Sequence, residues 1–306
     1  MNNLSNPLVS VIIPVFNDAE RLQTCLHALE HQTYSQNLYE VIVVDNASTI
    51  DIKGIVSQFK QARFAYEGHP GSYAARNQGI ALARGDVLAF TDADCIPAQN
   101  WIEQGVNRFM HTPNCGLVAG VIALFFQQAA HPTAVELYDS IKIGFPQQQF
   151  VEESRYGATA NLFTSRAVFE AVGLFNHSLK SSGDREWGQR VFAAGYQQIY
   201  AEDVCVAHPA RATWAQLRKK VIRIMGGHQD LSRRQEGSFV RFITRSLLAS
   251  LKDFLPPLRM YFYIWTNQRL QGNRQKIQFL LAMLFVRYVR SWERVRLLAG
   301  GVSSRG

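Results

Sequence analysis

Acidic side chains follow two apolar runs of the sequence, at the points where each run ends. Asp45 comes directly after residues 40–44 (EVIVV), and Asp92 and Asp94 follow residues 87–90 (VLAF). Two carboxylates on the turn after a strand can converge on a hard divalent cation, Mg²⁺ or Mn²⁺, that neutralises a diphosphate. A carboxylate at the position of Asp45 can accept hydrogen bonds from a base or a ribose. The alternatives are an acidic turn in which Asp94 caps the next helix, and an Asx-turn at Asp45.

Four more polar side chains stand where binding or proton transfer could use them. Arg76 lies in a small-residue segment at 71–77 (GSYAARN) that opens a helix, where backbone amides and a guanidinium suit phosphate. Asp184 and Glu186 lie near the start of another expected helix, where Asp184 can act as general base on an acceptor hydroxyl. His208 ends an extended run, and its neutral imidazole can complete the ligands of a metal. The alternatives are a capped helix with a surface arginine, two acids that complement a helix dipole, and a histidine that is packed or surface-exposed.

Strand and helix patterns alternate from residue 8 to residue 94. Residues 8–15 and 40–44 are β-branched apolar runs, which are typical of strands buried on both faces. Leucines at helical spacing between them predict a helix over residues 18–31, which completes a βαβ unit. The other elements expected here are helices at 51–60 and 72–83 and strands at 64–66 and 87–90. This order predicts an α/β, doubly wound sheet, which binds ligands at the carboxyl ends of its strands.

The pattern becomes mixed after residue 115 and helical after residue 210. We expect a strand at 116–126, helices at 165–172 and 186–194, and an extended segment at 199–206, whereas residues 127–160 show no clear pattern. Further helices are expected at 214–224, 239–254 and 276–298, with breaks at Pro256-Pro257 and at the polar link 267–273.

The net charge changes sign along the chain. Residues 1–210 hold 13 Lys and Arg against 20 Asp and Glu, which is −7, and residues 211–306 hold 19 against 4, which is +15. This change divides the chain into a catalytic domain over residues 1–210 and a basic, amphipathic helical region over residues 211–306. In the last helix, one side is apolar and another carries Arg287, Arg290 and Arg294. The apolar side comprises Ile277, Leu281, Leu284, Tyr288, Trp292 and Val295.

An apolar and cationic helix of this kind can lie in a membrane interface. We therefore hypothesise that residues 211–306 attach the protein to an anionic membrane surface that carries a lipid-linked acceptor. The alternative is that these helices pack on the catalytic domain with their arginines solvated.

Cysteine usage and apolar run lengths bear on the compartment. The four cysteines are scattered without a C-x-x-C pair, which favours a reducing compartment over a disulfide framework or a zinc site. Residues 9–16 form a short apolar run with a proline and no basic segment before it, so a buried strand is favoured over a signal peptide. No run reaches the roughly 18 apolar residues of a membrane-spanning helix. The expectation is a cytoplasmic protein, with peripheral attachment at the inner face of the membrane under the membrane hypothesis.

Five sequence blocks, in this order, resemble glycosyltransferase family 2. The resemblance covers roughly residues 8–210 and implies a GT-A fold, a nucleotide-diphospho-sugar donor and inversion at the anomeric carbon. The blocks are VIIPVFN (11–17), VVDNAS (43–48), ARNQG (75–79), GD with FTDAD (85–94), and VGLF (172–175) ahead of GDRE (183–186).

The resemblance also implies a role for individual residues. Asp45 resembles the acid that contacts the nucleotide, and Asp92 and Asp94 resemble the pair that contacts metal and donor. Asp184 resembles the catalytic base, and His208 a late residue often near the metal. The first and third blocks add donor-binding candidates, which are Pro14, Asn17, Arg76 and Asn77.

The chain departs from the family pattern in two places. The family commonly shows Glu-Asp where this chain has Gly183-Asp184, which leaves the base open between Asp184 and Glu186. The Gln-x-x-Arg-Trp motif of processive synthases is absent from the sequence, which favours a single addition to a polysaccharide, glycan or lipid-linked acceptor.

Two rival functions make different demands on the sequence. A sugar-phosphate nucleotidyltransferase needs a Gly-rich phosphate loop after the first strand, where residues 14–17 read PVFN. A non-catalytic nucleic-acid-binding protein could use the basic tail, but that function leaves the acidic motifs unexplained, and the tail has no recognised binding signature. A nucleic acid is therefore not an expected partner.

Overall fold

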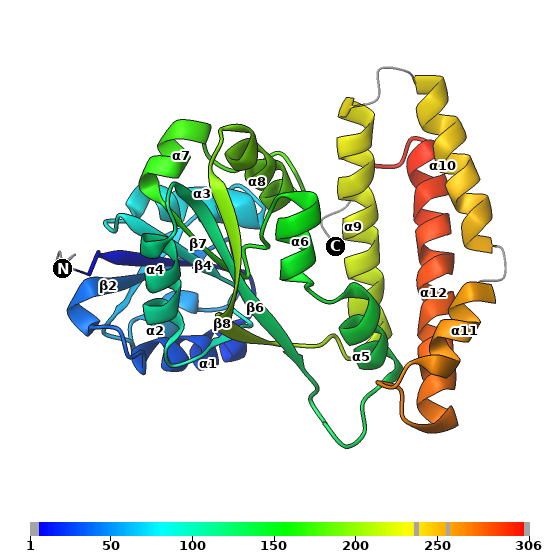
Figure 1. Ribbon diagram of the computed structural model, residues 1–306, viewed down its shortest axis with the longest axis horizontal. Helices are drawn as coiled ribbons and strands as arrows, with labels where there is room; N and C mark the ends of the chain where they lie inside the picture. The colour runs from blue at the N-terminus through cyan, green and yellow to red at the C-terminus, as the bar shows by residue number, and fades with distance from the viewer. Residues whose placement is uncertain (1–5, 236–238, 255–257, 303–306) are drawn as a thin grey trace. The chain divides into compact units, whose positions relative to one another are not determined.

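The computed structural model describes residues 6–235, 239–254 and 258–302. The chain forms two compact units, and Figure 1 labels most of their helices and many of their strands. The first unit comprises Met1–Ala123, Phe145–Ser178 and Gly183–His208. The second comprises Leu124–Gly144, Leu179–Ser182 and Pro209–Gly306. Two segments from within residues 1–210 thus belong to the second unit, and the division at residue 210 stays a prediction.

Four parallel strands form one half of the sheet of the first unit. They are β1 (Val9–Val15), β2 (Tyr39–Asp45), β3 (Ala62–Tyr66) and β4 (Val87–Thr91). β1 lies between β2 and β4, and Val15 pairs with Asp45 at the carboxyl ends. The connections contain α1 (Ala19–Glu30), η1 (Gln36–Leu38), α2 (Ile52–Val56) and α3 (Ser72–Leu82). The predicted alternation of strands and helices over residues 8–94 is confirmed.

The other half of the sheet contains antiparallel pairs. β7 (Asn161–Ser165) pairs with β4 and with β6 (Cys115–Phe125), and β5 (Ile96–Pro97) pairs with β8 (Gln197–Pro209). The strand order is β3-β2-β1-β4-β7-β6-β8-β5, so the sheet is mixed and of the predicted α/β class. β7 has no counterpart among the predicted strands, because this short segment is defined by partners distant in sequence rather than by its own alternation.

Helices cover both faces of this sheet. Along β1, Val11 and Ile13 belong to the apolar cluster that includes α1, whereas Ile12 belongs to the cluster that includes α3. The alternation follows from the two-residue period of a strand and explains why these strands are apolar at nearly every position. The remaining helices of the unit are α4 (Trp101–His111), α6 (Gln147–Ser154), α7 (Arg166–Val172) and α8 (Gly183–Ala193).

The second unit is helical and has its own apolar core. Its helices are α5 (Ala134–Tyr138), the π-helical turn η2 (Asp139–Ile143), α9 (Trp214–Gln235), α10 (Phe239–Phe254), α11 (Leu258–Thr266) and α12 (Gly272–Leu298). Leu217 of α9 and Phe279 of α12 are fully buried in that core. The expected helices at 239–254 and 276–298 are confirmed, and Pro256 and Pro257 lie outside the described residues. Within the described ranges, no helix combines the length and apolar character needed to cross a bilayer.

Candidate active site at the carboxyl ends of the parallel strands

Asn17 joins the loop after β1 to the loop after β2. Its side-chain Oδ1 accepts hydrogen bonds from the backbone N of Thr49 at 2.8 Å and from Thr49 Oγ1 at 3.0 Å. Its backbone N donates to Ser48 Oγ at 2.8 Å. Asn17 has a left-handed backbone, with φ at 50°, a conformation that asparagine adopts more readily than most residues. The parallel pairing of β1 with β2 places their carboxyl ends at one edge of the sheet, and these bonds join the two loops that follow.

Asp45 lies at that edge and is buried, with 7% of its surface exposed. Its Oδ1 accepts a hydrogen bond from the backbone N of Ser48 at 3.0 Å. The local turn weighed as the alternative for Asp45 is therefore present. It does not conflict with a contact to a nucleotide, because an ionised carboxylate has more acceptor sites than this single bond uses.

Asn46 fixes the backbone of the segment that leads into α3. Its residue type alone did not indicate this role. Its Nδ2 donates to the backbone oxygens of Glu67 and His69, at 2.9 and 2.8 Å. Its Oδ1 accepts from the backbone N of Gly71 at 2.6 Å. Gly71 precedes α3 with φ at 132°, a value that glycine tolerates and other residues avoid. The VVDNAS block is the sequence signal that contains this asparagine.

Arg76 of α3 reaches Asp92, the first acid after β4. The Nη2 atom of Arg76 lies 2.5 Å from Asp92 Oδ1, and only 4% of the arginine side chain is exposed. The surface-arginine alternative is therefore wrong. Within the described residues, Nε of Arg76 has no hydrogen-bond partner, so a buried positive group with unused donor capacity lies at the strand ends.

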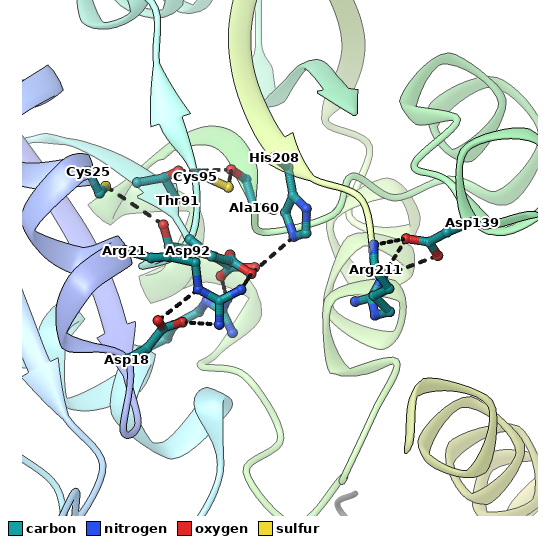
Figure 2. Close-up of polar contacts among 12 residues, drawn as sticks. Asp18, Arg21, Cys25, Thr91, Asp92, Cys95, Asp139, Ala160, His208 and Arg211 are labelled. Carbon is teal, nitrogen blue, oxygen red and sulfur yellow. Dashed lines mark hydrogen bonds and ion pairs between the residues drawn. The ribbon is translucent and has the colours of Figure 1, made fainter. Parts of the chain in front are cut away.

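Asp94 points to different partners from Asp92. Its Oδ2 lies 3.4 Å from His208 Nε2 and 3.8 Å from an Nη of Arg21, which also pairs with Asp18 at 2.6 Å. Figure 2 shows His208 extending from its strand toward this acidic turn, with Arg21 and Asp18 on the other side. The antiparallel pairing of β5 with β8 brings residues 94 and 208 together, although they are far apart in sequence.

The acidic turn supplies donors that fit a hard divalent cation in part. Carboxylate oxygen suits Mg²⁺ and Mn²⁺, and an imidazole is a common metal ligand. Among the described residues, however, no three His, Cys, Asp or Glu side chains form a group that could hold a metal ion. Asp94 and His208 are the two that approach each other, and substrate phosphate oxygens commonly complete such sites.

The two acids at the start of α8 have different surroundings. Oδ1 of Asp184 accepts from Tyr73 Oη at 3.2 Å and from the backbone N of Arg185 at 2.9 Å. Burial is the main cause that raises the pKa of Asp184, and these hydrogen bonds and the charge of Arg76 act against it. Glu186 instead makes a two-pronged ion pair with Arg190, at 2.9 and 3.1 Å. Asp184 thus combines an acceptor oxygen with an environment that increases its affinity for a proton.

Two donor-binding candidates have structural partners. Nδ2 of Asn77 donates to the backbone oxygen of Phe175 at 2.8 Å, and its Oδ1 accepts from the Phe175 backbone N at 3.1 Å. Asn77 therefore joins α3 to the VGLF block. Pro14 lies inside β1, where it pairs with Val44 of β2.

Comparisons with known proteins agree with this architecture. The pattern described as Glycosyl transferase family 2 matches residues 10–172. Glycosyltransferase AglE of Haloferax volcanii is 42% identical over 226 residues, which is 72% of this chain and 73% of AglE. A pre-mycofactocin glycosyltransferase of Mycobacterium tuberculosis is 30% identical over 70% of this chain, and the match spans 45% of that relative.

A solved structure shows the same fold. The mannosyltransferase PcManGT from Pyrobaculum calidifontis, in complex with GDP-Man and Mn²⁺, superposes with a TM-score of 0.64 at 18% identity. The superposition covers 94% of this chain and 88% of PcManGT.

Proposed function

The chain belongs to glycosyltransferase family 2, and we propose that it moves a sugar, with inversion, from a nucleotide-diphospho-sugar to an acceptor hydroxyl. One observation carries the proposal: the loops after β1, β2 and β4 share an edge of a GT-A sheet, where Arg76 pairs with Asp92 and Asp94 approaches His208. Membership of this family argues against the two alternative functions, a sugar-phosphate nucleotidyltransferase and a non-catalytic nucleic-acid-binding protein. The GDP-Man bound by PcManGT supports a nucleotide-diphospho-sugar donor.

The donor lies, in this proposal, along the strand ends. Asp45 accepts hydrogen bonds from the nucleoside, and the loop organised by Asn17 shapes the space beside it. Arg76 supplies positive charge to the diphosphate and holds Asp92 in place. Buried positive charge is worth more here than at the surface, because water screens it less.

A divalent cation, Mg²⁺ or Mn²⁺, would when bound neutralise charge on the leaving diphosphate. Asp94 and His208 are the residues that would hold it, with Asp92 as the predicted third ligand. The Mn²⁺ in PcManGT supports a divalent cation at this position.

Asp184 is the proposed general base. The acceptor oxygen attacks the anomeric carbon opposite the diphosphate, the bond from that carbon to the diphosphate oxygen breaks, and the hydroxyl proton moves to Asp184. The raised pKa of Asp184 suits this task, because a base accepts a proton more readily when its pKa approaches the working pH. The missing Gln-x-x-Arg-Trp motif supports one addition per acceptor rather than a growing polymer.

Thermal unfolding with nucleotide diphosphates tests the proposed donor site. Specific binding to the folded state raises Tm. We expect at least one nucleoside diphosphate to raise Tm more with Mn²⁺ than without it, and Asp94→Asn to remove the Mn²⁺-dependent part. Asp203→Asn is a matched control, because Asp203 pairs with Arg108 outside this cluster. The donor-site proposal is wrong if no nucleoside diphosphate changes Tm under either condition.

We also propose that the second unit binds an anionic membrane surface that presents the acceptor. The six apolar residues expected on one side of α12 are all exposed, by 41% to 60%, and they include Tyr288 and Trp292. The opposite side of α12, with Phe279 and Met283, is buried in the core of the unit. Packing inside the unit therefore leaves this apolar side uncovered, and such amphipathic helices insert at the headgroup boundary.

Charge supports a lipid partner over a second copy of the chain. The side chains of Asp253 and Glu293 are both paired, with Arg294 at 3.1 Å and with Arg296 at 2.6 Å. Exposed cations remain elsewhere on the unit. Arg274, for example, lies three residues before Ile277, the first of the six exposed apolar residues of α12, which we call the stripe. Two regions that each carry +15 repel each other, whereas anionic lipid attracts them.

Vesicle co-sedimentation tests this partner. We expect the chain to sediment with vesicles of anionic phosphatidylglycerol, weakly with phosphatidylcholine, and to lose most anionic binding in Leu281→Glu/Trp292→Glu. Met110→Glu is the matched control, because Met110 is exposed on α4 of the first unit. Anionic binding that survives the double substitution contradicts the assignment of the stripe, and so does self-association that the double substitution abolishes.

A further inference from the structure

Tyr73 lies against the proposed base. It is the second residue of α3, with 7% of its surface exposed, and its Oη donates the 3.2 Å hydrogen bond to Asp184 Oδ1. The ring centroid of Phe175 lies 5.8 Å from that of Tyr73, and the guanidinium carbon of Arg76 lies 5.8 Å from the Tyr73 centroid. The ring thus has an aromatic and a cationic neighbour, and its hydroxyl is directed to the carboxylate.

Gly183 is the residue that makes room for this ring. A Cβ atom at position 183 would lie 2.7 to 2.9 Å from three ring atoms of Tyr73. Contacts that short do not occur between real side chains, so a residue larger than glycine would displace the ring. Glycine at position 183 and the position of the Tyr73 ring are therefore one structural feature.

We infer that Tyr73 is a positioning residue, whose hydroxyl orients the Asp184 carboxylate and stabilises it by donating a hydrogen bond. This inference rests on the proposed role of Asp184 as base. A phenol suits this task better than a carboxylate, because it donates a hydrogen bond to the anion whereas a second anion would repel it.

The groups around Asp184 act in opposite directions. Tyr73 and Arg76 face it from α3, the backbone N of Arg185 binds it from α8, and Tyr156 interacts with it from the segment after α6. Burial raises the pKa of Tyr73 above its usual value, so the phenol keeps its proton and remains a donor at working pH. Burial raises the pKa of Asp184, and the Tyr73 hydrogen bond acts against that effect. Without this donor, Asp184 becomes protonated at a higher pH.

Tyr73→Phe is the decisive variant, because it removes the hydroxyl and keeps the ring. We expect the acid limb of the kcat profile to move to higher pH, with kcat reduced about tenfold on that limb and little changed on the alkaline plateau. The KM for donor should stay unchanged. Tyr39→Phe is the matched control, because it removes a buried hydroxyl that donates to the Leu29 backbone oxygen away from Asp184.

Two outcomes distinguish a failure of this inference from a failure of the proposal that Asp184 is the base. If Asp184→Asn keeps its turnover, the assignment of the base fails. If Asp184→Asn is inactive and Tyr73→Phe has the pH profile of the unaltered enzyme, only the role of Tyr73 fails.

A double-substitution cycle tests the packing without using activity. Gly183→Ala should lower Tm, and this loss should be smaller in a Tyr73→Ala background, because the clashing ring is gone. Equal losses in the two backgrounds would show that the ring does not require glycine at position 183.

Discussion

Asp184 and Glu186 show how neighbours of the same chemical type acquire different partners. Both lie in the first turn of α8. Glu186 is held by both nitrogens of the Arg190 fork, whereas Asp184 accepts from a phenol and a backbone amide. The residue pattern left the base open between these two acids, and their different partners support Asp184 as the proposed base.

The first prediction compares neutral variants of these two acids. Asp184→Asn should lower kcat by about 10²–10⁴-fold, because a general base contributes that much, and should leave donor binding intact. Glu186→Gln should retain kcat within severalfold. Initial rates of nucleoside diphosphate release, together with donor titration, check both. The opposite ranking of the two variants would move the base to Glu186.

The second prediction concerns the effect of Asp184 on stability. Burial raises its pKa, so the folded state favours the protonated carboxyl, and ionisation at neutral pH destabilises the fold. This cost disappears as pH falls below that pKa. Asp184→Asn should therefore have a higher Tm than the unaltered chain near neutral pH. This difference in Tm should vanish at about pH 4, the ordinary pKa of an aspartate. Scanning calorimetry across pH measures it, and a gain that is the same at every pH would contradict the argument.

At the scale of elements, α3 positions most of the site. It carries Tyr73, Arg76 and Asn77, which contact Asp184, Asp92 and the backbone of Phe175. Close packing of α3 on the sheet depends on Gly79. A Cβ atom there would lie 2.5 Å from Ile12 Cγ2 and 3.3 Å from Val44 Cγ2.

The third prediction follows from that packing. Gly79→Ala should lower the free energy of unfolding by about 1–3 kcal/mol through overpacking, and lower kcat as α3 shifts. Gly68→Ala is the control, because its nearest side-chain atom would lie at an ordinary 3.5 Å in an exposed loop. Urea denaturation of both variants provides the comparison, and equal stability would show that α3 can move without loss.

Helices α10 and α12 show a second use of arginine. Arg287 donates to the backbone oxygens of Lys252 and Asp253 at the end of α10, and Arg294 pairs with the carboxylate of Asp253. The cationic side of α12 was expected to be solvated or to face lipid. All three of its arginines instead contact the last turn of α10, since Arg290 also lies 3.8 Å from the Asp253 carboxylate. Carbonyl groups and a helix dipole favour positive charge there.

At the scale of the whole molecule, charge and exposed apolar surface belong to the same sequence region. Residues 211–306 carry +15, and the second unit contains the exposed stripe of α12. Electrostatic attraction is screened by salt, whereas burial of apolar side chains is not.

The fourth prediction uses that difference. Raising NaCl from about 0.05 to about 0.5 M should reduce binding to anionic vesicles severalfold, because the screening length falls below the size of the lipid headgroup layer. Part of the binding should remain through Trp292 and its apolar neighbours. Co-sedimentation across the salt series measures both parts, and complete insensitivity to salt would exclude a role for the cations.

Local sequence predicted much of the first unit because the required information is local. β-branched runs and leucines at helical spacing located β1, α1 and β2, and the family blocks located the polar residues. α4 and β7 were not predicted. Their burial depends on contacts between distant segments, such as the 2.9 Å hydrogen bond from Trp101 to Asn161.

The alternation of strands and helices over residues 8–94, the acidic turns after β2 and β4, and the resemblance to glycosyltransferase family 2 follow from the sequence alone, since residue type and period carry them. Tertiary structure alone decided the partners of each acid. Asp92 meets Arg76, Asp94 meets His208, and Asp184 meets Tyr73 across 111 positions of chain. Hydrogen bonds and ion pairs depend on distance in space, and only the packed sheet and its helices bring these atoms within reach.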